Sequence, residues 1–319
     1  MAVYTEVDDD ALESFLSEYD LGPPTSCKGI AEGVENSNYL LQTERGNFIL
    51  TLYEKRVKRE DLPFFLGLME HLSAAGLRCP LPIRGRDGNV IRELCGRPAA
   101  IISFLQGLST KRVLPDHCRQ VGDALARLHL AGASFKLTRK NALSLEGWRP
   151  LFTATRDRAD EVRAGLAESI ERDLADITAR WPADLPRGVI HADLFPDNVL
   201  FVADQLSGMI DFYFACNDFY AYDLAICLNA WCFERDLSFN ATKAKQLVGA
   251  YSRVRPLSER EIAMLPLLAR GSALRFLLTR LYDWLNQPAG ALVRPHDPLE
   301  YEAKLRFHGS VRSATAYGL

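Results

Sequence analysis

Three oxygen-bearing side chains lie close together in the middle of the chain. Asp193 and Asn198 fall in the polar stretch 191–198, and Asp211 ends the apolar run that follows. Mg²⁺ prefers hard oxygen ligands and completes its shell with phosphates and water. In phosphoryl transfer, a further carboxylate orients the attacking hydroxyl group. We therefore interpret Asn198 and Asp211 as Mg²⁺ ligands and Asp193 as the catalytic base of a phosphoryl transfer.

The elements that must position these side chains are short strands. Apolar runs at 189–190, 199–202 and 209–210 are separated by polar segments that contain Asp, Pro and Gly. Such runs are typical of strands bounded by turns. The pattern predicts strand, loop, strand, turn and strand, with the three side chains at the mouth of one small hairpin.

The loop itself carries a recognisable motif. H-A-D-L-F-P-D-N at 191–198 resembles the catalytic loop of the protein-kinase-like superfamily, whose kinase form is H-R-D-x-x-x-x-N. I-D-F at 210–212 resembles the metal-binding segment that follows that loop. Ala192 in place of Arg, and the lack of Gly after Phe212, indicate the aminoglycoside and choline phosphotransferase-like branch. The alternative is a chance H-x-D in a turn, with Asp and Asn as turn residues.

A further signature of that branch is D-L-A, found here at 223–225. In the branch, its Asp helps to hold the catalytic loop. The resemblance therefore implies that Asp223 and His191 support the loop. A-L-A-R-L-H at 124–129 resembles another helix of the branch, and we interpret its His129 as a core histidine.

Composition limits the class of protein. The 319 residues are 48% hydrophobic and 25% charged, with a net charge of −3, which is ordinary for about two globular domains. The net charge argues against a nucleic-acid partner bound by a basic face. No apolar run reaches the length of a membrane span, and the acidic N-terminus differs from a secretory signal. Seven Cys without a C-x-x-C pair indicate a reduced, cytoplasmic protein.

The order of the expected elements gives the fold class. The N-terminal part predicts a capped helix at 8–19, strands at 27–31, 39–43 and 48–53, a helix at 62–75, and two further strands ending at 103. Helices at 115–131, 157–180 and 259–284 dominate the rest. We expect an α+β, bilobal, protein-kinase-like fold. Its lobes would be a nucleotide-binding antiparallel-sheet lobe at 1–103 and a helical catalytic and substrate lobe at 108–319, joined by a hinge at about 103–107.

Nucleotide contacts are expected at two places in the first lobe. The loop 32–38 stands where the superfamily covers the phosphates, but it holds only Gly33. Its polar end can still bind phosphate through backbone and side-chain groups, since such turns form anion-binding concavities; these residues are Asn36, Ser37 and Asn38. In relatives the backbone of the lobe connection binds adenine; the matching residues are Ser103, Phe104 and Leu105.

One residue departs from the kinase pattern. In kinase-like folds a Lys on the third strand reaches the α- and β-phosphates, and Thr51 stands at that position here. The charged run 54–59 is the candidate source of a replacement cation, although each of its residues alone is typical of a solvated face.

Four strings together resemble the homoserine kinase family of this fold. They are G-V-E-N-S-N-Y at 33–39, F-I-L-T-L-Y-E at 48–54, L-P-F-F-L-G-L-M at 62–69 and V-I-H-A-D-L-F-P-D-N-V-L-F at 189–201. Thr51 is shared with that family. The resemblance implies Mg²⁺-dependent transfer of the ATP γ-phosphate to the side-chain hydroxyl of L-homoserine, in threonine biosynthesis.

An amino-acid substrate also needs partners for its carboxylate and ammonium groups. Arg suits a carboxylate because its fork donates two parallel hydrogen bonds. Arg275 and Arg139 are candidates, and Asp218 is a candidate for the ammonium group, although such residues more often form structural ion pairs. We expect a small-molecule substrate, no nucleic acid, no membrane, and a monomer or homodimer.

Three alternatives remain open. One is another small-molecule kinase of this fold, acting on choline, methylthioribose or another hydroxylated amine. The second is a nucleotide-binding pseudokinase, which Thr51 and the Gly-poor loop favour and the intact triad of Asp193, Asn198 and Asp211 opposes. The third is a protein kinase or an antibiotic-resistance enzyme. No A-P-E segment follows Phe212, and no acidic cluster suited to a polycation accompanies the motifs.

Overall fold

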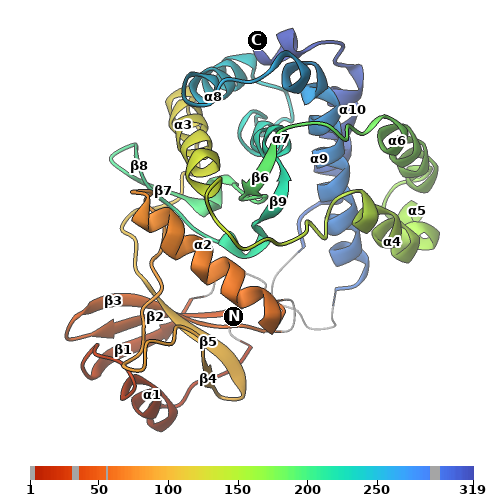
Figure 1. The fold of residues 1–319 in the computed structure, drawn as a ribbon. Helices are drawn as coiled ribbons and strands as arrows, with labels where there is room; N and C mark the ends of the chain where they lie inside the picture. Colours follow the sequence, from red (N-terminus) through yellow and green to blue (C-terminus); the bar gives the residue numbers. More distant parts are fainter. Residues whose placement is uncertain (1–3, 31–35, 55–56, 288–294) are drawn as a thin grey trace. The chain divides into compact units, whose positions relative to one another are not determined.

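The elements of the chain group into two compact units. The computed structural model describes residues 4–30, 36–54, 57–287 and 295–319. The first unit comprises Met1–Gly107 with Ser207–Tyr213, and the second comprises Leu108–Leu206 with Phe214–Leu319 (Figure 1). The assignment of nucleotide and substrate binding to separate lobes stays a prediction.

The first unit is built on a five-stranded sheet in the order β1-β2-β3-β5-β4, whose neighbouring strands are antiparallel. Its elements are α1 (Asp9–Leu16), β1 (Pro24–Gly29), β2 (Ser37–Thr43), β3 (Gly46–Leu52), α2 (Leu62–Ala74), β4 (Arg92–Leu94) and β5 (Arg97–Ser103).

Strand β2 shows the alternating burial of a strand with one face on the core, and the capped amphipathic helix α1 covers part of the sheet. Side chains of β2 alternate between buried and half-buried, as expected where one face meets the core. Asp8 caps α1 by accepting a hydrogen bond from Ala11 N at 2.7 Å. Leu12 and Phe15 of α1 belong to one core cluster with Leu50 of β3.

The second unit is mainly helical. Its strands are β6 (Arg187–Ile190), β7 (Val199–Val202), β8 (Gln205–Met209, which continues into the first unit) and β9 (Cys216–Phe219). Its helices are α3 (Pro115–Gly132), α4 (Leu145–Thr155), α5 (Ala159–Val162), α6 (Leu166–Arg180), α7 (Tyr220–Trp231), α8 (Ala241–Val254), α9 (Glu259–Leu285) and α10 (Pro298–Ser310).

Two helices form the core of this unit. Nearly every residue of α7 is buried, and α9 packs against α7, α10, α4 and α6 (Figure 1). By length and composition alone α9 could span a membrane, because its most apolar window has a mean hydropathy of 1.4. However, 67% of that window is buried inside the structure. This burial is typical of the core helix of a globular protein.

Helices α3 and α8 approach closely at one glycine. A Cβ atom on Gly122 of α3 would lie 2.1 Å from the carbonyl oxygen of Leu247 in α8. Only a residue without a Cβ permits this packing. The contact fixes the distance between two helices that also carry polar residues described below.

One helix expected from the sequence is wrong. The helix predicted at 157–180 is divided into α5 and α6. Arg163 is extended, and Gly165 adopts a left-handed conformation with φ of 74°. Glycine takes this conformation without a steric penalty, so the charged helical pattern is interrupted there.

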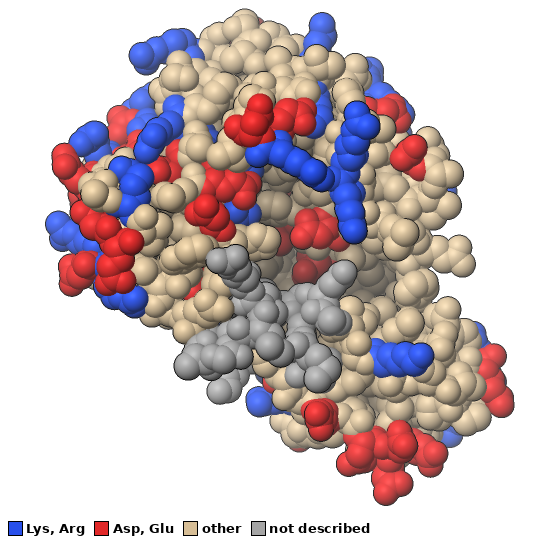
Figure 2. Space-filling model, turned by 180° about the vertical axis from the view of Figure 1, so that it is seen from behind, with Lys and Arg blue, Asp and Glu red and all other residues tan. Residues whose placement is uncertain are grey.

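Charged side chains are mixed on the surface. Acidic and basic residues lie interspersed over the face drawn in Figure 2. This distribution accords with 38 Lys and Arg against 41 Asp and Glu in the whole chain.

Candidate active site

The loop that carries Asp193 starts at the end of β6 and contains a residue in an uncommon backbone conformation. Ala192 has φ of 63°, a region that non-glycine residues rarely enter. Its N–H group donates to Asp223 Oδ1 at 2.9 Å, and its carbonyl oxygen accepts from Arg275 Nη1 at 2.5 Å. Such strain persists where surrounding contacts over-determine it, and here they act on both sides of the residue.

Asp223 holds the loop through its backbone amides. Its Oδ2 also accepts from His191 N at 2.7 Å and lies 3.0 Å from His129 Nε2. Burial alone would raise the pKa of this completely buried carboxyl group, but the hydrogen bond from His129 and the nearby histidines lower it below its ordinary 3.8. Asp223 is therefore an ionised carboxylate that holds two consecutive backbone amides.

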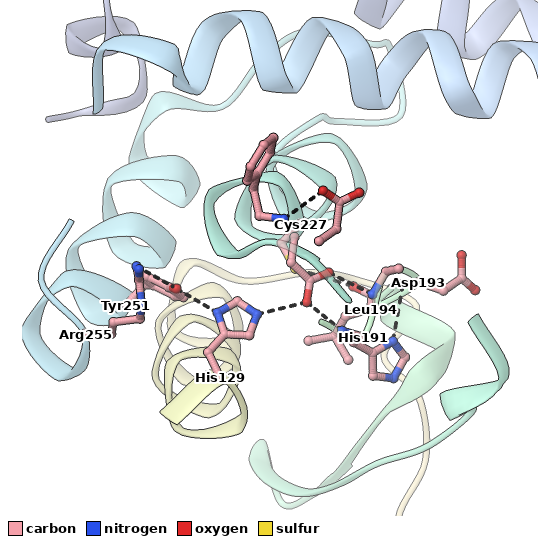
Figure 3. Close-up of polar contacts among 11 residues, drawn as sticks. His129, His191, Asp193, Leu194, Cys227, Tyr251 and Arg255 are labelled. Atoms are coloured by element: carbon pink, nitrogen blue, oxygen red, sulfur yellow. Dashed lines mark hydrogen bonds and ion pairs between the residues drawn. The ribbon is translucent and has the colours of Figure 1, made fainter. Parts of the chain in front are cut away.

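Asp193 is held in place yet keeps contact with solvent. Its side chain is 18% exposed, and Arg275 Nη2 lies 3.9 Å from its Oδ1. Asn198 donates from Nδ2 to the Asp193 carbonyl oxygen at 2.8 Å and to Oδ2 at 3.3 Å. The loop thus places a carboxylate and an amide beside a buried cation, Arg275, which comes from α9. Figure 3 shows His191 beside Asp193.

Asn198 meets the requirement for a metal ligand. Its Nδ2 is used within the loop, so Oδ1 is the side-chain atom left to bind a cation. An amide oxygen is a hard ligand of the kind that Mg²⁺ prefers. The residues Pro196–Asn198 form a short 3₁₀ turn that directs this side chain.

Asp211 belongs to the first unit. It follows β8, has φ of 63°, and is exposed. The strand before it is tied to the first unit by Met209 N, which donates to Arg78 O at 2.9 Å, and by Ser207 Oγ, which donates to Gln106 O at 2.7 Å. The structure therefore carries Asp211 on a separate unit from Asp193 and Asn198.

The three polar residues expected to contact phosphates are engaged within the first unit. Ser37 is completely buried, and its hydroxyl donates to Glu54 Oε1 at 2.8 Å. Asn38 Oδ1 accepts from Thr51 Oγ1 at 2.8 Å, and Asn36 Oδ1 accepts from Glu54 N at 3.4 Å. These side-chain atoms therefore stabilise β2 and β3. Gly33 and the cations at 55 and 56 lie outside the described residues.

The connection after β5 leaves fewer backbone groups for a base than expected. Ser103 N donates to Leu81 O at 2.8 Å, and Ser103 Oγ accepts from Leu81 N at 2.9 Å. Ser103 is thus committed to the first unit. Of the three residues expected to bind adenine, Phe104 and Leu105 remain for that contact.

The residues considered for substrate binding lie in different places. Arg275 is buried against the loop, with its guanidinium 4.2 Å from the centre of the Phe276 ring. Arg139 Nη1 donates to Ala215 O at 3.2 Å. Asp218 accepts from Asn141 Nδ2 at 2.7 Å, and burial raises its pKa. Among the contacts that the structure describes for these three residues, an ion pair with Asp193 is formed by Arg275.

Sequence reasoning missed the polar residues behind Asp223. His129 is buried, as expected of a core histidine, but it contacts Asp223 and Tyr251 across 94 and 122 positions of the chain. No local spacing signals contacts at such separations. The nearest signal was the resemblance of 124–129 to a helix of the phosphotransferase branch.

Comparison with known proteins gives a consistent family. Residues 26–257 match the "Phosphotransferase enzyme family". The homoserine kinase of Paramagnetospirillum magneticum is 63% identical over 100% of both chains. The homoserine kinase of Afipia carboxidovorans is 66% identical over 100% of this chain and 98% of its own.

Solved structures share the fold at low identity. Amicoumacin kinase hAmiN, in complex with AMP-PNP, Ca²⁺ and Ami, has a TM-score of 0.70 at 14% identity and covers 96% of this chain and 93% of its own. Choline kinase from Cryptosporidium parvum has a TM-score of 0.68 at 15% identity and covers 94% of both chains. The expected kinase-like α+β fold, with a small antiparallel-sheet lobe and a large helical lobe, is confirmed.

Proposed function

We propose that this chain, which belongs to the homoserine kinase family within the phosphotransferase enzymes, transfers the γ-phosphate of ATP to the side-chain hydroxyl of L-homoserine. The product would be O-phospho-L-homoserine, an intermediate of threonine biosynthesis. Support for this acceptor is that relatives 63% and 66% identical, matched over the full length of this chain, carry the name homoserine kinase.

The observation that carries the proposed mechanism is the fixed position of Asp193. Its carboxylate would accept a hydrogen bond from the homoserine hydroxyl, orient that oxygen towards the γ-phosphate, and take its proton. The loop conformation is held by Asp223 on one side and Arg275 on the other. Little reorganisation is then needed when the acceptor binds.

Asn198 and Asp211 would supply oxygen ligands to Mg²⁺. The donor set fits, because one amide oxygen and one carboxylate leave room for phosphate oxygens and water in the octahedral shell. When bound, the ion would neutralise charge that develops on the phosphate oxygens. The protein's part is to hold Asn198 Oδ1 in position through its Nδ2 contacts with Asp193.

Backbone groups would bind the nucleotide in this protein. The polar side chains of Asn36, Ser37 and Asn38 are engaged by Glu54 and Thr51, so we assign phosphate contact there to main-chain amides. Phe104 and Leu105 would contact the adenine base. Thr51 donates to Asn38 and supplies no cation.

We assign Arg275 to the loop and not to the substrate carboxylate. Its Nη1 is bonded to Ala192 O, and the side chain is 3% exposed. Arg139 remains a candidate for the carboxylate group of homoserine. Asp218 remains a candidate for the ammonium group only through an oxygen that also accepts from Asn141 Nδ2 or Phe219 N.

The acceptor is tested by measuring Mg²⁺-dependent ADP release from ATP. L-Homoserine would be compared with choline, methylthioribose, L-serine and kanamycin at equal concentration. We expect stimulation by L-homoserine alone. Stimulation by another acceptor would overturn the substrate assignment, and ATP binding without stimulation by any acceptor would favour a pseudokinase.

A further inference from the structure

A buried chain of hydrogen bonds runs from the start of α9 to the catalytic loop. Arg255 Nη1 donates to Glu261 Oε1 at 2.9 Å and to Tyr251 Oη at 3.3 Å. Tyr251 Oη lies 2.7 Å from His129 Nδ1, and His129 Nε2 lies 3.0 Å from Asp223 Oδ2 (Figure 3). Asp223 then accepts from the two loop amides. All of these groups belong to the second unit.

The residues at the two ends of this hydrogen-bond series decide which group donates and which accepts at each step. Arg255 can only donate, so the Tyr251 oxygen accepts from it and the Tyr251 proton points to His129 Nδ1. His129 must then carry its proton on Nε2, where it donates to Asp223. Burial lowers the pKa of His129 below its ordinary 6.5, which agrees with a neutral ring. An ionised Asp223 is the acceptor that this tautomer requires.

Packing leaves the ring of His129 little freedom. Its centre lies 4.7 Å from that of Tyr220, and the Arg255 guanidinium lies 4.5 Å from the centre of the Tyr220 ring. Gly122 permits the close approach of α3, which carries His129, to α8, which carries Tyr251. Position and proton direction are therefore both fixed at this histidine.

We propose that Tyr251 and Arg255 are positioning residues for phosphoryl transfer, acting through His129 and Asp223 on the catalytic loop. By fixing the His129 tautomer, they keep the Asp223 carboxylate aimed at the His191 and Ala192 amides. Those amides set the left-handed turn that presents Asp193. The kinetic consequence rests on the proposed function, whereas the effect on the loop amides does not.

The protein contains a second buried Tyr–His pair that serves as a matched control. Tyr317 Oη lies 2.7 Å from His308 Nδ1, the same distance as in the Tyr251–His129 pair, and both Tyr317 and His308 are buried. His308 Nε2 lies 3.2 Å from Asn229 Oδ1, and Asn229 Nδ2 donates to Ala269 O at 2.9 Å. This second series of hydrogen bonds ends on helix α9 and not on the catalytic loop.

The kinetic test compares Tyr251→Phe with Tyr317→Phe. Each substitution deletes one hydroxyl that faces a buried histidine, so both should lower the melting temperature to a similar extent. We expect kcat to fall about tenfold in Tyr251→Phe alone, with KM for both substrates within about twofold of wild type, since small misplacements of a catalytic group reduce turnover. Equal kcat values in the two variants would overturn the proposal.

An activity-independent test measures amide hydrogen exchange at His191 and Ala192 without substrate. We expect exchange at least about tenfold faster in Tyr251→Phe and unchanged in Tyr317→Phe, because opening of a local contact exposes its amides. Unchanged exchange in Tyr251→Phe would overturn the proposal, even if homoserine proved not to be the acceptor. Nitrogen NMR of the six histidines should show His129 protonated on Nε2; the other tautomer would contradict it.

A second variant covers a failure of Tyr251→Phe to fold. Arg255→Lys keeps the charge beside Glu261 but shortens the reach to Tyr251. The same loss of kcat and the same faster exchange at His191 and Ala192 are expected. Wild-type kcat and exchange in a folded Arg255→Lys protein would overturn the role of Arg255.

Discussion

Arg275 donates from Nη1 to the carbonyl oxygen of Ala192 at 2.5 Å, and Ala192 is the residue before Asp193. The contact joins α9 to a loop 83 positions earlier in the chain. Because Ala192 has φ of 63°, its carbonyl direction is not one that the backbone favours by itself. A buried cation therefore contributes to the conformation that presents the proposed base.

Replacing Arg275 by Lys should lower kcat by about ten- to a hundredfold. Lys keeps the charge but is a single point donor without the planar fork of Arg, so the hydrogen bond to the Ala192 carbonyl oxygen is weakened. Steady-state kinetics with L-homoserine check this. Arg270→Lys is the matched control, because Arg270 lies on the same helix and pairs with Asp173 and Asp176 instead of the loop. A similar kcat loss in both variants would contradict the specific role.

Asp223→Asn should destabilise the protein at pH 7 by about 3 kcal/mol, the usual cost of breaking a buried charged contact. The folded-state pKa of Asp223 is lowered, so its contribution is fully present above the ordinary 3.8 and is lost as pH falls through the folded value. Urea unfolding at several pH values should show the difference between wild type and variant shrinking below about pH 4.

Asp218→Asn should show the opposite dependence of its destabilisation on pH. Burial raises the folded-state pKa of Asp218 above 3.8, so wild type gains stability as pH falls through that raised value. The cost of Asp218→Asn should therefore be smaller at pH 7 than near pH 4. If the destabilisation by Asp218→Asn and by Asp223→Asn varied with pH in the same way, the opposite pKa shifts of the two carboxyl groups would be contradicted.

His308 should make the protein sensitive to mild acid. Burial lowers its pKa from 6.5 to about 3, so below pH 6.5 the unfolded chain binds a proton that the folded protein does not. Stability should fall by up to about 1.4 kcal/mol per pH unit from this residue. Urea unfolding between pH 6.5 and 4.5 should show a shallower dependence of stability on pH for His308→Gln than for wild type, and an equal dependence would contradict this effect of His308.

Gly122→Ala should destabilise the protein by about 1–3 kcal/mol, the usual cost of overpacking. Its Cβ would lie 2.1 Å from Leu247 O, which is backbone and cannot swing aside. Gly249→Ala on α8 is the control, because the nearest atom, on the side chain of Arg253, is 3.7 Å from the added Cβ. Since Ala favours a helix over Gly, thermal unfolding should show that variant unchanged or slightly stabilised.

The local parts of the site were predictable from the sequence, and the reason is physical. Asp193 and Asn198 lie five positions apart on one loop, so one motif contains both of them. The cap at Asp8 and the start of α9 at Glu259 follow from local hydrogen bonding as well. Long-range partners carry no such signal, and His129 acquires its role only when three helices pack together.

Two features that the sequence did not predict have similar causes. A charged helical pattern at 157–180 hid the left-handed Gly165, whose conformation the neighbouring residues do not dictate. Ser37 belongs to a polar turn by composition, yet its hydroxyl is buried against Glu54 and accepts from Tyr4 N at 2.8 Å. Burial of a polar group depends on partners that are distant in the sequence.

The proposed mechanism depends on the Asp193 carboxylate to orient and deprotonate the acceptor. The most direct measurement is kcat of Asp193→Asn with ATP, Mg²⁺ and L-homoserine, beside Asp197→Asn, which changes an exposed carboxylate of the same loop. We predict that Asp193→Asn lowers kcat by about 10²–10⁴-fold while ATP binding is retained, and that Asp197→Asn stays within about threefold of wild type. Retained turnover in Asp193→Asn, or an equal loss in both variants, would contradict this role of Asp193.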